Sequence, residues 1–179
     1  MEVIECIRRD RATRSFTDEP VTQQTVTKLI DAARRAGSGK NRQPWSFIAV
    51  QDRDRLDDLA TFGQYTTPLT RAPLAIVVLV KNRDPNGPRL GDAMDCGRAF
   101  QNLKLAVTAH GLGGVPQTVD SESAGELLNV PDDLTVLIAL AIGHPAGPDD
   151  TIEGAPKSDV LESPARKPVS ELLHWEQYS

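Results

Sequence analysis

The 179 residues are enough for one domain, and a composition of 39% apolar and 25% charged residues is ordinary for a soluble globular chain. The formal charge of −5 argues against a general nucleic-acid binder, and no apolar run approaches the roughly 18 residues of a membrane helix, so neither nucleic acid nor membrane is an expected partner. Two cysteines make neither a disulfide framework nor a zinc cluster, and the N-terminus lacks a secretory signal, so we expect free thiols and a cytoplasmic location.

Apolar spacing predicts two helices in the first 45 residues. The first covers residues 2–9, and its shared apolar face consists of Val3, Ile4 and Ile7. The second covers 22–36, where apolar residues recur at the spacing of one buried stripe. Thr22 is a suitable N-cap, and Gly37 stands where a left-handed residue commonly ends a helix.

The rest of the chain alternates helices with apolar strands. We expect strands at 46–50, 74–80 and 134–142, helices at 53–62, 92–110 and 121–129, a loop at 81–91 and a Gly-rich segment at 111–119. The strand at 74–80 shows no alternation, so both of its faces should be buried. The long helix should end at Gly111 and line up one apolar side from Met94, Ala99, Phe100, Leu103 and Val107. This order predicts an α/β or an α+β domain with helices on both sides of a sheet.

Residues 145–168 contain five prolines and no periodic pattern. So long a stretch without regular structure is unusual inside a compact domain. The chain is therefore expected to form a single domain over 1–179, with 145–179 as an extended arm that wraps a partner subunit.

Motifs for metal binding and nucleophilic catalysis do not stand out. The three histidines have no ligand spacing, and Cys96 lies inside a helical pattern rather than at its start, so a low thiol pKa is not indicated. The GLGG sequence at 111–114 follows a helix instead of a strand, which argues against a Rossmann loop. We therefore assign no catalytic residue and no metal ligand.

Two polar segments remain as candidate binding sites. Arg11 and Arg14 lie three residues apart in the N-terminal part of the chain, where nine Lys/Arg oppose six Asp/Glu over residues 1–45. Two guanidinium groups at this spacing suit a terminal phosphate, and a solvated basic turn is the alternative. The second segment is the Gly-rich loop before Trp45, whose uncharged polar side chains are Ser38, Asn41 and Gln43. They could read the polar edge of a planar heterocycle, or cap backbone groups of an ordinary loop.

These segments resemble the FMN-dependent nitroreductase family. R-A-T-R-S-F at 11–16 is similar to the family's R-R-S-x-R-x-F, and G-S-G-K-N-R-Q-P-W at 37–45 to its P-S-x-x-N-x-Q-P-W. The helix ending in G-L-G-G at 111–114, the A-I-G-H-P-A at 141–146 and a late basic residue, Arg166, complete five blocks in family order.

The resemblance implies an α+β fold with a central, mostly antiparallel sheet flanked by helices, built as an intertwined homodimer. It implies one FMN at each subunit interface. The phosphate would be held by Arg11, Ala12, Arg14 and Arg166. The ribityl chain and ring would meet, from the other subunit, Gly37, Ser38, Gly39, Asn41 and Gln43. The flavin ring would be approached by the backbone of Gly113 and Gly114.

The activity implied is ping-pong hydride transfer from NAD(P)H through flavin N5 to nitro, quinone or similar acceptors. A specialised FMN dehydrogenase or oxidase of a biosynthetic pathway, and a non-catalytic flavin-binding protein, remain as alternatives. Three positions depart from the motifs: Asp10 replaces an arginine, Ala12 a serine and Gly37 a proline. Asp10 would repel a phosphate by about 1 kcal/mol across water, unless it orients Arg11 or Arg14 instead. We therefore expect weaker FMN binding than in typical members, and a flavin cover reduced to residues 81–91 or absent.

Overall fold

The computed structural model describes residues 2–82, 87–147 and 166–178. The α-helices are α1 (Val3–Arg9), α2 (Gln23–Ala33), α3 (Arg53–Thr61), α4 (Leu90–Ala109) and α5 (Ser121–Leu127). The strands are β1 (Trp45–Val50), β2 (Leu74–Lys81), β3 (Gly113–Gln117) and β4 (Leu134–Gly143). Short 3₁₀ helices are η1 (Gly39–Asn41), η2 (Thr67–Thr70) and η3 (Val169–Glu171). The chain divides into two compact units, residues 1–149 and 150–179, and all the named elements except η3 belong to the first.

The strands form one sheet in the order β1-β2-β4-β3, and each neighbouring pair is antiparallel. Trp45 stands opposite Val80 on one side of the sheet, and Gly113 stands opposite Gly143 on the other. The two central strands, β2 and β4, are the most apolar segments of the sequence. Seven of the eight residues of β2 are buried, which confirms that the strand without alternation is covered on both faces.

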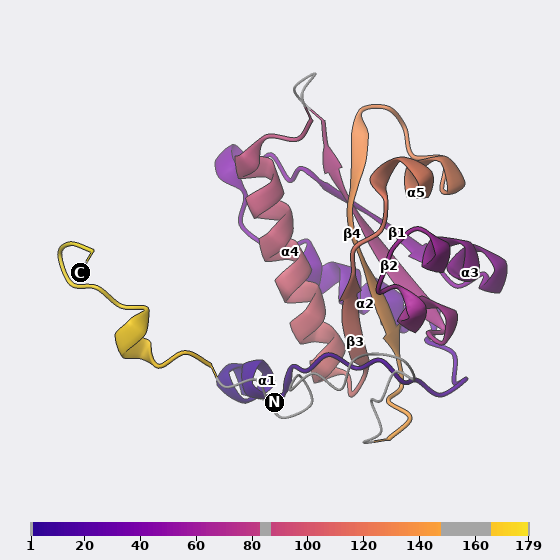
Figure 1. The fold of residues 1–179 in the computed structure, drawn as a ribbon, viewed down its shortest axis with the longest axis horizontal. Coiled ribbons are helices and arrows are strands. Elements are labelled where there is room, and N and C mark those ends of the chain that lie inside the picture. The colour runs from indigo at the N-terminus through magenta and orange to yellow at the C-terminus, as the bar shows by residue number, and fades with distance from the viewer. Residues whose placement is uncertain (1, 83–86, 148–165, 179) are drawn as a thin grey trace. The chain divides into compact units, whose positions relative to one another are not determined.

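Helices cover both faces of this sheet (Figure 1). On one face α2 and α4 pack against the strands through a buried cluster that includes Leu29, Leu103, Ile76 and Leu140. On the other face α3, η2 and α5 pack through a second buried cluster that includes Leu56, Leu69, Val77 and Ala124. The expected α+β fold, an antiparallel sheet between two helical layers, is therefore confirmed.

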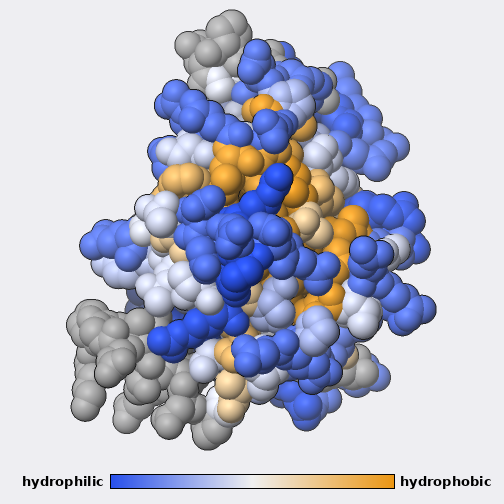
Figure 2. All heavy atoms as spheres, turned by 90° about the vertical axis from the view of Figure 1, so that its right-hand side faces the viewer, coloured by the Kyte–Doolittle hydropathy of each residue, from blue (hydrophilic) through white to orange (hydrophobic). Residues whose placement is uncertain are grey.

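The face of α3 and α5 is not completely covered. Ile48, Phe62, Val130 and Leu134 are partly buried hydrophobic residues packed against this cluster. Figure 2 looks at the molecule from this side and shows apolar surface framed by polar side chains.

The largest differences from the sequence prediction are a missed strand and the end of the second helix. The Gly-rich segment at 111–119 contains a strand, β3, whose position at the sheet edge accommodates Pro116 because an edge strand tolerates a missing N–H. The second helix ends at Ala33, so Gly37 lies beyond its C-terminus and has no left-handed φ. Gly111, with φ of +74°, does end α4 as expected, and Thr22 caps α2 by accepting from the Thr25 N–H at 3.2 Å.

The buried side of α4 also differs from the expectation. It runs through Asp92, Cys96, Ala99, Leu103 and Val107, which are all buried. Met94 is instead 57% exposed, and Leu90 is 78% exposed. The apolar face of α1 is exposed as well in the single chain, since Val3, Ile4 and Ile7 keep 50–67% of their surface. Apolar side chains on α1 and α4 are thus exposed in the single chain.

Some expectations fall outside the described residues. The loop at 81–91 includes residues 83–86, and the arm at 145–168 consists mainly of residues 148–165, none of which is described. The arm, its contact with a partner and the single-domain organisation stay predictions. Among the described residues, no helix is long and apolar enough to cross a membrane.

Candidate functional site

The arginine-bearing N-terminal segment lies along the edge of the sheet. Ala12 pairs with Gly114 as an isolated parallel bridge, and the Thr13 N–H donates to the Gly114 carbonyl at 3.2 Å. Farther along, Phe16 pairs with Pro145, and the Ala146 N–H donates to the Ser15 carbonyl at 3.1 Å. Three motif blocks that are far apart in the sequence, at 11–16, 111–114 and 141–146, therefore meet at one edge.

Close contacts from neighbouring segments explain why β3 begins with two glycines. A Cβ atom on Gly113 would stand 2.4 Å from Thr13 Oγ1, a distance that real Cβ atoms do not show. A Cβ on Gly114 would stand 3.1 Å from the Ala141 carbonyl oxygen. Both glycines are buried. Gly113 lets Thr13 lie against β3, and Gly114 lets β3 lie close to β4. Their approach to a flavin ring stays a prediction.

The two predicted phosphate ligands have different surroundings. Arg11 is exposed, and its Nη1 donates to the carbonyl oxygens of Arg8 at 2.6 Å and Asp10 at 3.0 Å. These bonds fix the guanidinium beside the turn that follows α1. Arg14 is half-buried and lies on the part of the segment that pairs with the sheet. Both arginines thus sit on a backbone that the sheet edge holds in place.

Asp10 has a partner that the sequence did not indicate. Its Oδ2 lies 3.0 Å from Lys104 Nζ, and the two side chains keep only 13% and 16% of their surface. Thr108 Oγ1 lies 3.5 Å from the other carboxylate oxygen. Lys104 and Thr108 are both on α4, so Asp10 ties the end of α1 to that helix. The expected repulsion of a phosphate by Asp10 is therefore offset by a neighbouring ammonium charge.

The loop at 37–43 has an unusual backbone. Lys40, Asn41 and Gln43 have φ of 53°, 53° and 46°, in the left-handed region. Such a conformation costs a non-glycine residue about 1–2 kcal/mol, and less for asparagine. Left-handed residues of this kind cluster at functional sites and persist only where surrounding contacts hold them.

Hydrogen bonds within the loop supply part of that support. Ser38 Oγ accepts from the Gln43 N–H at 2.9 Å, and Gln43 Nε2 donates to Asn41 Oδ1 at 3.2 Å. Because these bonds use the acceptor oxygen of Asn41, its amide N–H groups are directed elsewhere and can donate to a ligand. A Cβ atom placed on Gly37 would meet nothing within 4 Å, so no contact in this chain requires a glycine there.

Two buried carboxylates on α4 supply the rest of the support for the left-handed backbone of the loop. Asp95 Oδ2 accepts from the Gly39 N–H at 2.9 Å, and Asp92 Oδ1 accepts from Arg42 Nε at 3.1 Å. Asp92 is fully buried, and Asp95 is 5% exposed. Neither residue was predicted from the sequence, where this part of α4 was treated only as a helix. The sequence does contain one indication of their role. The two carboxylates are three residues apart, on the side of α4 that otherwise packs against the sheet.

The two groups of predicted residues are attached to opposite ends of α4. The 37–43 loop is bound at Asp92 and Asp95, whereas the end of α1 is bound at Lys104 and Thr108. Twelve residues separate Asp92 from Lys104, which is about 18 Å along a helix axis. Figure 1 shows α1 beside one end of α4. Within a single chain, the two halves of the predicted site are therefore separated by much of the length of α4.

Arg166 belongs to the second unit, residues 150–179, where it is exposed. Its proposed contact with the phosphate stays a prediction. Apolar side chains of the same unit are also exposed, including Leu172 at 63% and Trp175 at 77%.

Other reactive side chains have structural surroundings. Burial raises the pKa of the Cys96 thiol to about 12, and the nearby carboxylates of Asp92 and Asp95 add to the effect. The thiol is therefore neutral and unreactive, as its place in the helix indicated. His110 caps the end of α4, and its Nδ1 lies 2.9 Å from the Ala106 carbonyl oxygen. The described residues contain no group of three potential metal ligands.

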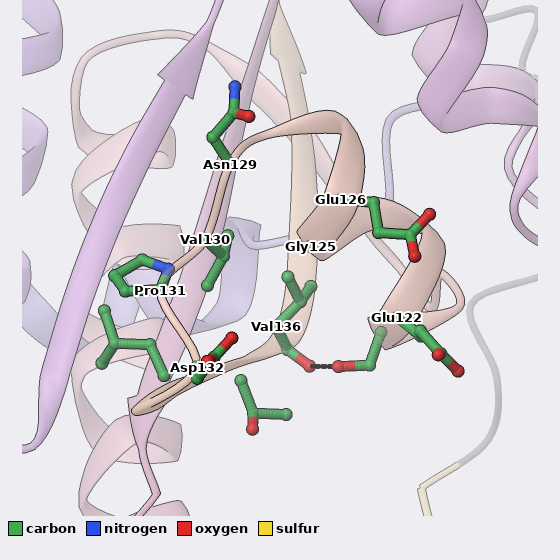
Figure 3. A pocket seen from close by; sticks show the side chains of 11 residues that line it. Glu122, Gly125, Glu126, Asn129, Val130, Pro131, Asp132 and Val136 are labelled. Atoms are coloured by element: carbon green, nitrogen blue, oxygen red, sulfur yellow. Dashed lines mark hydrogen bonds between the residues drawn. The ribbon is translucent and has the colours of Figure 1, made fainter.

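A surface cavity of about 540 Å³ lies beside α5 and the start of β4 (Figure 3). Its walls carry the acidic side chains of Glu122, Glu126 and Asp132. Negative charge at the rim is unfavourable for a phosphate, and none of the predicted cofactor residues lines this cavity. It does not fit the site that the motifs predict.

Comparison with known proteins identifies the relatives of this chain. The model of the nitroreductase family matches residues 7–68 and 64–144. A putative NADH dehydrogenase/NAD(P)H nitroreductase of Archaeoglobus fulgidus is 31% identical over 160 residues, which cover 85% of this chain and 90% of the relative. An FMN reductase [NAD(P)H] of Bacillus subtilis is 33% identical over 81% of this chain and 66% of its own length. The crystal structure of a putative NADH dehydrogenase/NAD(P)H nitroreductase from Parabacteroides distasonis is 28% identical, covers 98% of both chains and superimposes with a TM-score of 0.79.

Proposed function

The chain belongs to the nitroreductase family, and on that premise we propose that it is an FMN-dependent oxidoreductase that takes electrons from NAD(P)H. The resemblance drawn from the sequence motifs is confirmed by the family match. The names of the relatives, which include an FMN reductase [NAD(P)H], support FMN as the cofactor and NAD(P)H as the donor. The proposed acceptors are nitro compounds, quinones or similar small molecules, and the proposed location is the cytoplasm.

One observation carries this proposal most directly. The segment with Arg11 and Arg14 is fixed on the sheet edge through Ala12 and Thr13, over a glycine that leaves no room for a side chain. Two cations on a rigid backbone suit a phosphate monoester, since bidentate guanidinium contacts are directional. Asp10, the one anion in the motif, is turned to Lys104. The residues present therefore fit the phosphate end of FMN.

The other half of the site is proposed to come from a second copy of the chain. The 37–43 loop is attached about 18 Å along α4 from the anchor of the N-terminal segment, so one flavin is proposed to meet both only across a subunit interface. Exposed apolar side chains on α1 and at the start of α4 support a homodimer, since isolated chains rarely leave such surface uncovered. Gly97 on α4 has nothing within 4 Å of its Cβ position, which would permit close helix approach.

In this site the protein binds, orients and shields, and no side chain is proposed as a catalytic acid or base. FMN, when bound, would supply the hydride chemistry, with NAD(P)H and then an acceptor occupying the same place. Arg11, Arg14 and the arm residue Arg166 would hold the phosphate. Asn41 and Gln43 of the partner copy would direct amide groups at the ring or ribityl chain. These positions follow the family motif and their own surroundings.

Two purified heterodimers test whether the site is shared between chains. The first combines an Arg14→Ala chain with an Asn41→Ala chain, separated by two affinity tags. The second combines an Arg14→Ala/Asn41→Ala chain with a wild-type chain. If one site uses Arg14 from one chain and Asn41 from the other, the first heterodimer retains one intact site and the second retains none.

FMN titration of both heterodimers reads out the result. We expect tight binding of about one FMN per dimer in the first and only weak binding in the second. Weak FMN binding in the first heterodimer and tight binding in the second would place the complete site within one chain. If the wild-type dimer itself retains no FMN, the flavin function fails. Bound FMN that neither NADH nor NADPH reduces would instead support a carrier or a specialised dehydrogenase or oxidase.

A further inference from the structure

We propose that Asp95 is a positioning residue that fixes the 37–43 loop in the conformation in which it meets the flavin. This inference rests on the proposed function and adds a residue outside the motifs to the site. Asp95 lies on α4. It is outside the motif segments that resemble the family and outside the residues that the resemblance places at the flavin.

The carboxylate of Asp95 is placed between the loop and the helix. Its Oδ2 accepts from the backbone N–H of Gly39 at 2.9 Å, and its Oδ1 accepts from Arg98 Nη1 at 3.0 Å. Asp95 is 5% exposed, whereas the Arg98 side chain is 59% exposed. A buried carboxylate that accepts from a backbone N–H makes a directional, charge-assisted bond. The bond fixes the loop at the first residue of η1.

A second bond of the same kind lies one helical turn away. Asp92 Oδ1 accepts from Arg42 Nε at 3.1 Å, so the loop is attached to α4 on both sides of Lys40 and Asn41. Lys40 and Asn41 lie between these attachments, and Gln43 follows them directly. The two bonds therefore enclose two of the three left-handed residues of the loop, and the third lies next to the second bond.

Gly37 explains why the chain needs such an attachment. The motif of the family has a proline at this position, and proline would restrict the loop locally by fixing its own φ. A Cβ atom on Gly37 would meet nothing within 4 Å, and the bond from Arg98 to its carbonyl oxygen is long, at 3.5 Å. We therefore assign to α4, through Asp95 and Arg98, the rigidity that the sequence at 37 does not supply.

Substitution of Asp95 separates this role from general stability. Asp95→Ala removes the acceptor for Gly39 and leaves only a solvent-exposed Arg98 without its carboxylate, so the chain should fold. Asp95→Asn keeps an oxygen that can accept from Gly39 and loses only the charge. Asp120→Ala is the matched control, because its carboxylate also accepts from a backbone N–H, that of Ser123 at 2.9 Å, at the start of α5 and outside the proposed site.

Two readouts are needed for each variant. The first is amide hydrogen exchange of residues 38–43 in the flavin-free protein, which does not depend on FMN binding. The second is the dissociation constant for FMN. We expect Asp95→Ala to speed exchange of the loop and to weaken FMN binding about tenfold, as for loss of a bond to a charged group. Asp95→Asn should stay within about threefold of the wild type, and Asp120→Ala should change neither readout.

Unchanged exchange of the loop in Asp95→Ala, or equal loss in the Ala and Asn variants, would overturn the proposal. Faster loop exchange in Asp95→Ala, together with no FMN binding by the wild type, would support the attachment of the loop and reject the flavin function. Failure of the attachment and failure of the proposed function are therefore distinguishable. If Asp95→Ala does not fold, Asp95→Ser, whose hydroxyl is too short to reach Gly39, gives the same comparison.

Discussion

Thr13 lies directly over Gly113, so close that a Cβ atom on the glycine would stand 2.5 Å from the Cβ of the threonine. The contact joins the N-terminal arginine segment to the strand that follows α4. Thr13 also donates its N–H to the next residue of that strand, Gly114, at 3.2 Å. The position of the two arginines therefore depends on the absence of a side chain in a distant part of the sequence.

Gly113→Ala should displace the arginine segment from the sheet edge. The added methyl group would overlap Thr13, whose backbone must then move, so we expect FMN affinity to fall at least tenfold and the protein to lose about 1–3 kcal/mol of stability, as in overpacked cores. Isothermal titration with FMN and thermal unfolding measure the two effects.

Gly125→Ala is the control for this substitution. The new Cβ would lie 3.9 Å from Val130 in ordinary contact, and alanine is the better helix former, so stability should rise by up to about 1 kcal/mol with FMN affinity unchanged. Equal FMN affinity in the Gly113→Ala variant and the wild type would show that the contact does not position the arginines.

Lys104→Met should weaken FMN binding, although Lys104 is expected to touch no part of the flavin. Its removal leaves the carboxylate of Asp10 without its ammonium partner beside the phosphate segment, which restores the repulsion that the pair offsets. We expect a loss of roughly 1–3 kcal/mol in stability, because the pair is only partly exposed, and a weaker FMN complex. The double variant Asp10→Asn/Lys104→Met should recover most of both losses. Additive losses in the double variant would mean that the two side chains act independently.

Arg14→Ala tests the phosphate assignment. Removal of a charged hydrogen-bond donor from the phosphate should weaken FMN binding by about 1.5–3 kcal/mol. Arg34→Ala is a suitable comparison, since Arg34 is an exposed residue directly after α2, in an ion pair with Asp31. Unchanged flavin occupancy after desalting of the Arg14→Ala protein would remove this residue from the site.

Cys96 should make the protein less stable in alkaline solution. Burial raises the pKa of its thiol from an ordinary value of 9.0 to about 12, so above pH 9 the unfolded chain releases a proton that the folded chain retains. The contribution of the buried thiol is therefore complete below pH 9 and decreases as the pH rises toward 12.

Comparison with Cys96→Ala isolates this group from the lysines and tyrosines that titrate in the same range. The melting temperature of the wild type should fall more steeply between about pH 9 and 11 than that of the variant, whatever their difference at neutral pH. Parallel curves for the two proteins would show that the thiol does not have a raised pKa.

The sequence predicted the elements whose apolar pattern is unambiguous. The run LAIVVLV became β2, buried on both faces, and Thr22 and Gly111 mark helix ends as expected. β3 was missed because Gly113, Gly114 and Pro116 disfavour a strand locally, and pairing with β4 overrides that preference. Met94 was placed on the wrong side because α4 carries apolar residues on its exposed side as well.

The binding residues of the candidate site were predicted through motifs, whereas the residues that hold those segments in place were not. Short patterns identified Arg11, Arg14 and the 37–43 loop, but Lys104 lies 94 residues from Asp10, and Asp95 lies 56 residues from Gly39. Such contacts depend on the packing of α4 against the sheet, which local spacing does not encode. The left-handed backbone of Lys40 and Gln43 was equally invisible, since both residues usually avoid it.

The proposed function requires that this chain holds FMN and that a nicotinamide reduces it. Purified protein is incubated with FMN, desalted, and its visible absorption spectrum is recorded before and after NADPH or NADH is added under argon. We expect the oxidised flavin band to stay with the protein and to bleach on addition of the reductant. A band lost on desalting, or a retained band that neither nucleotide bleaches, would contradict the proposed function.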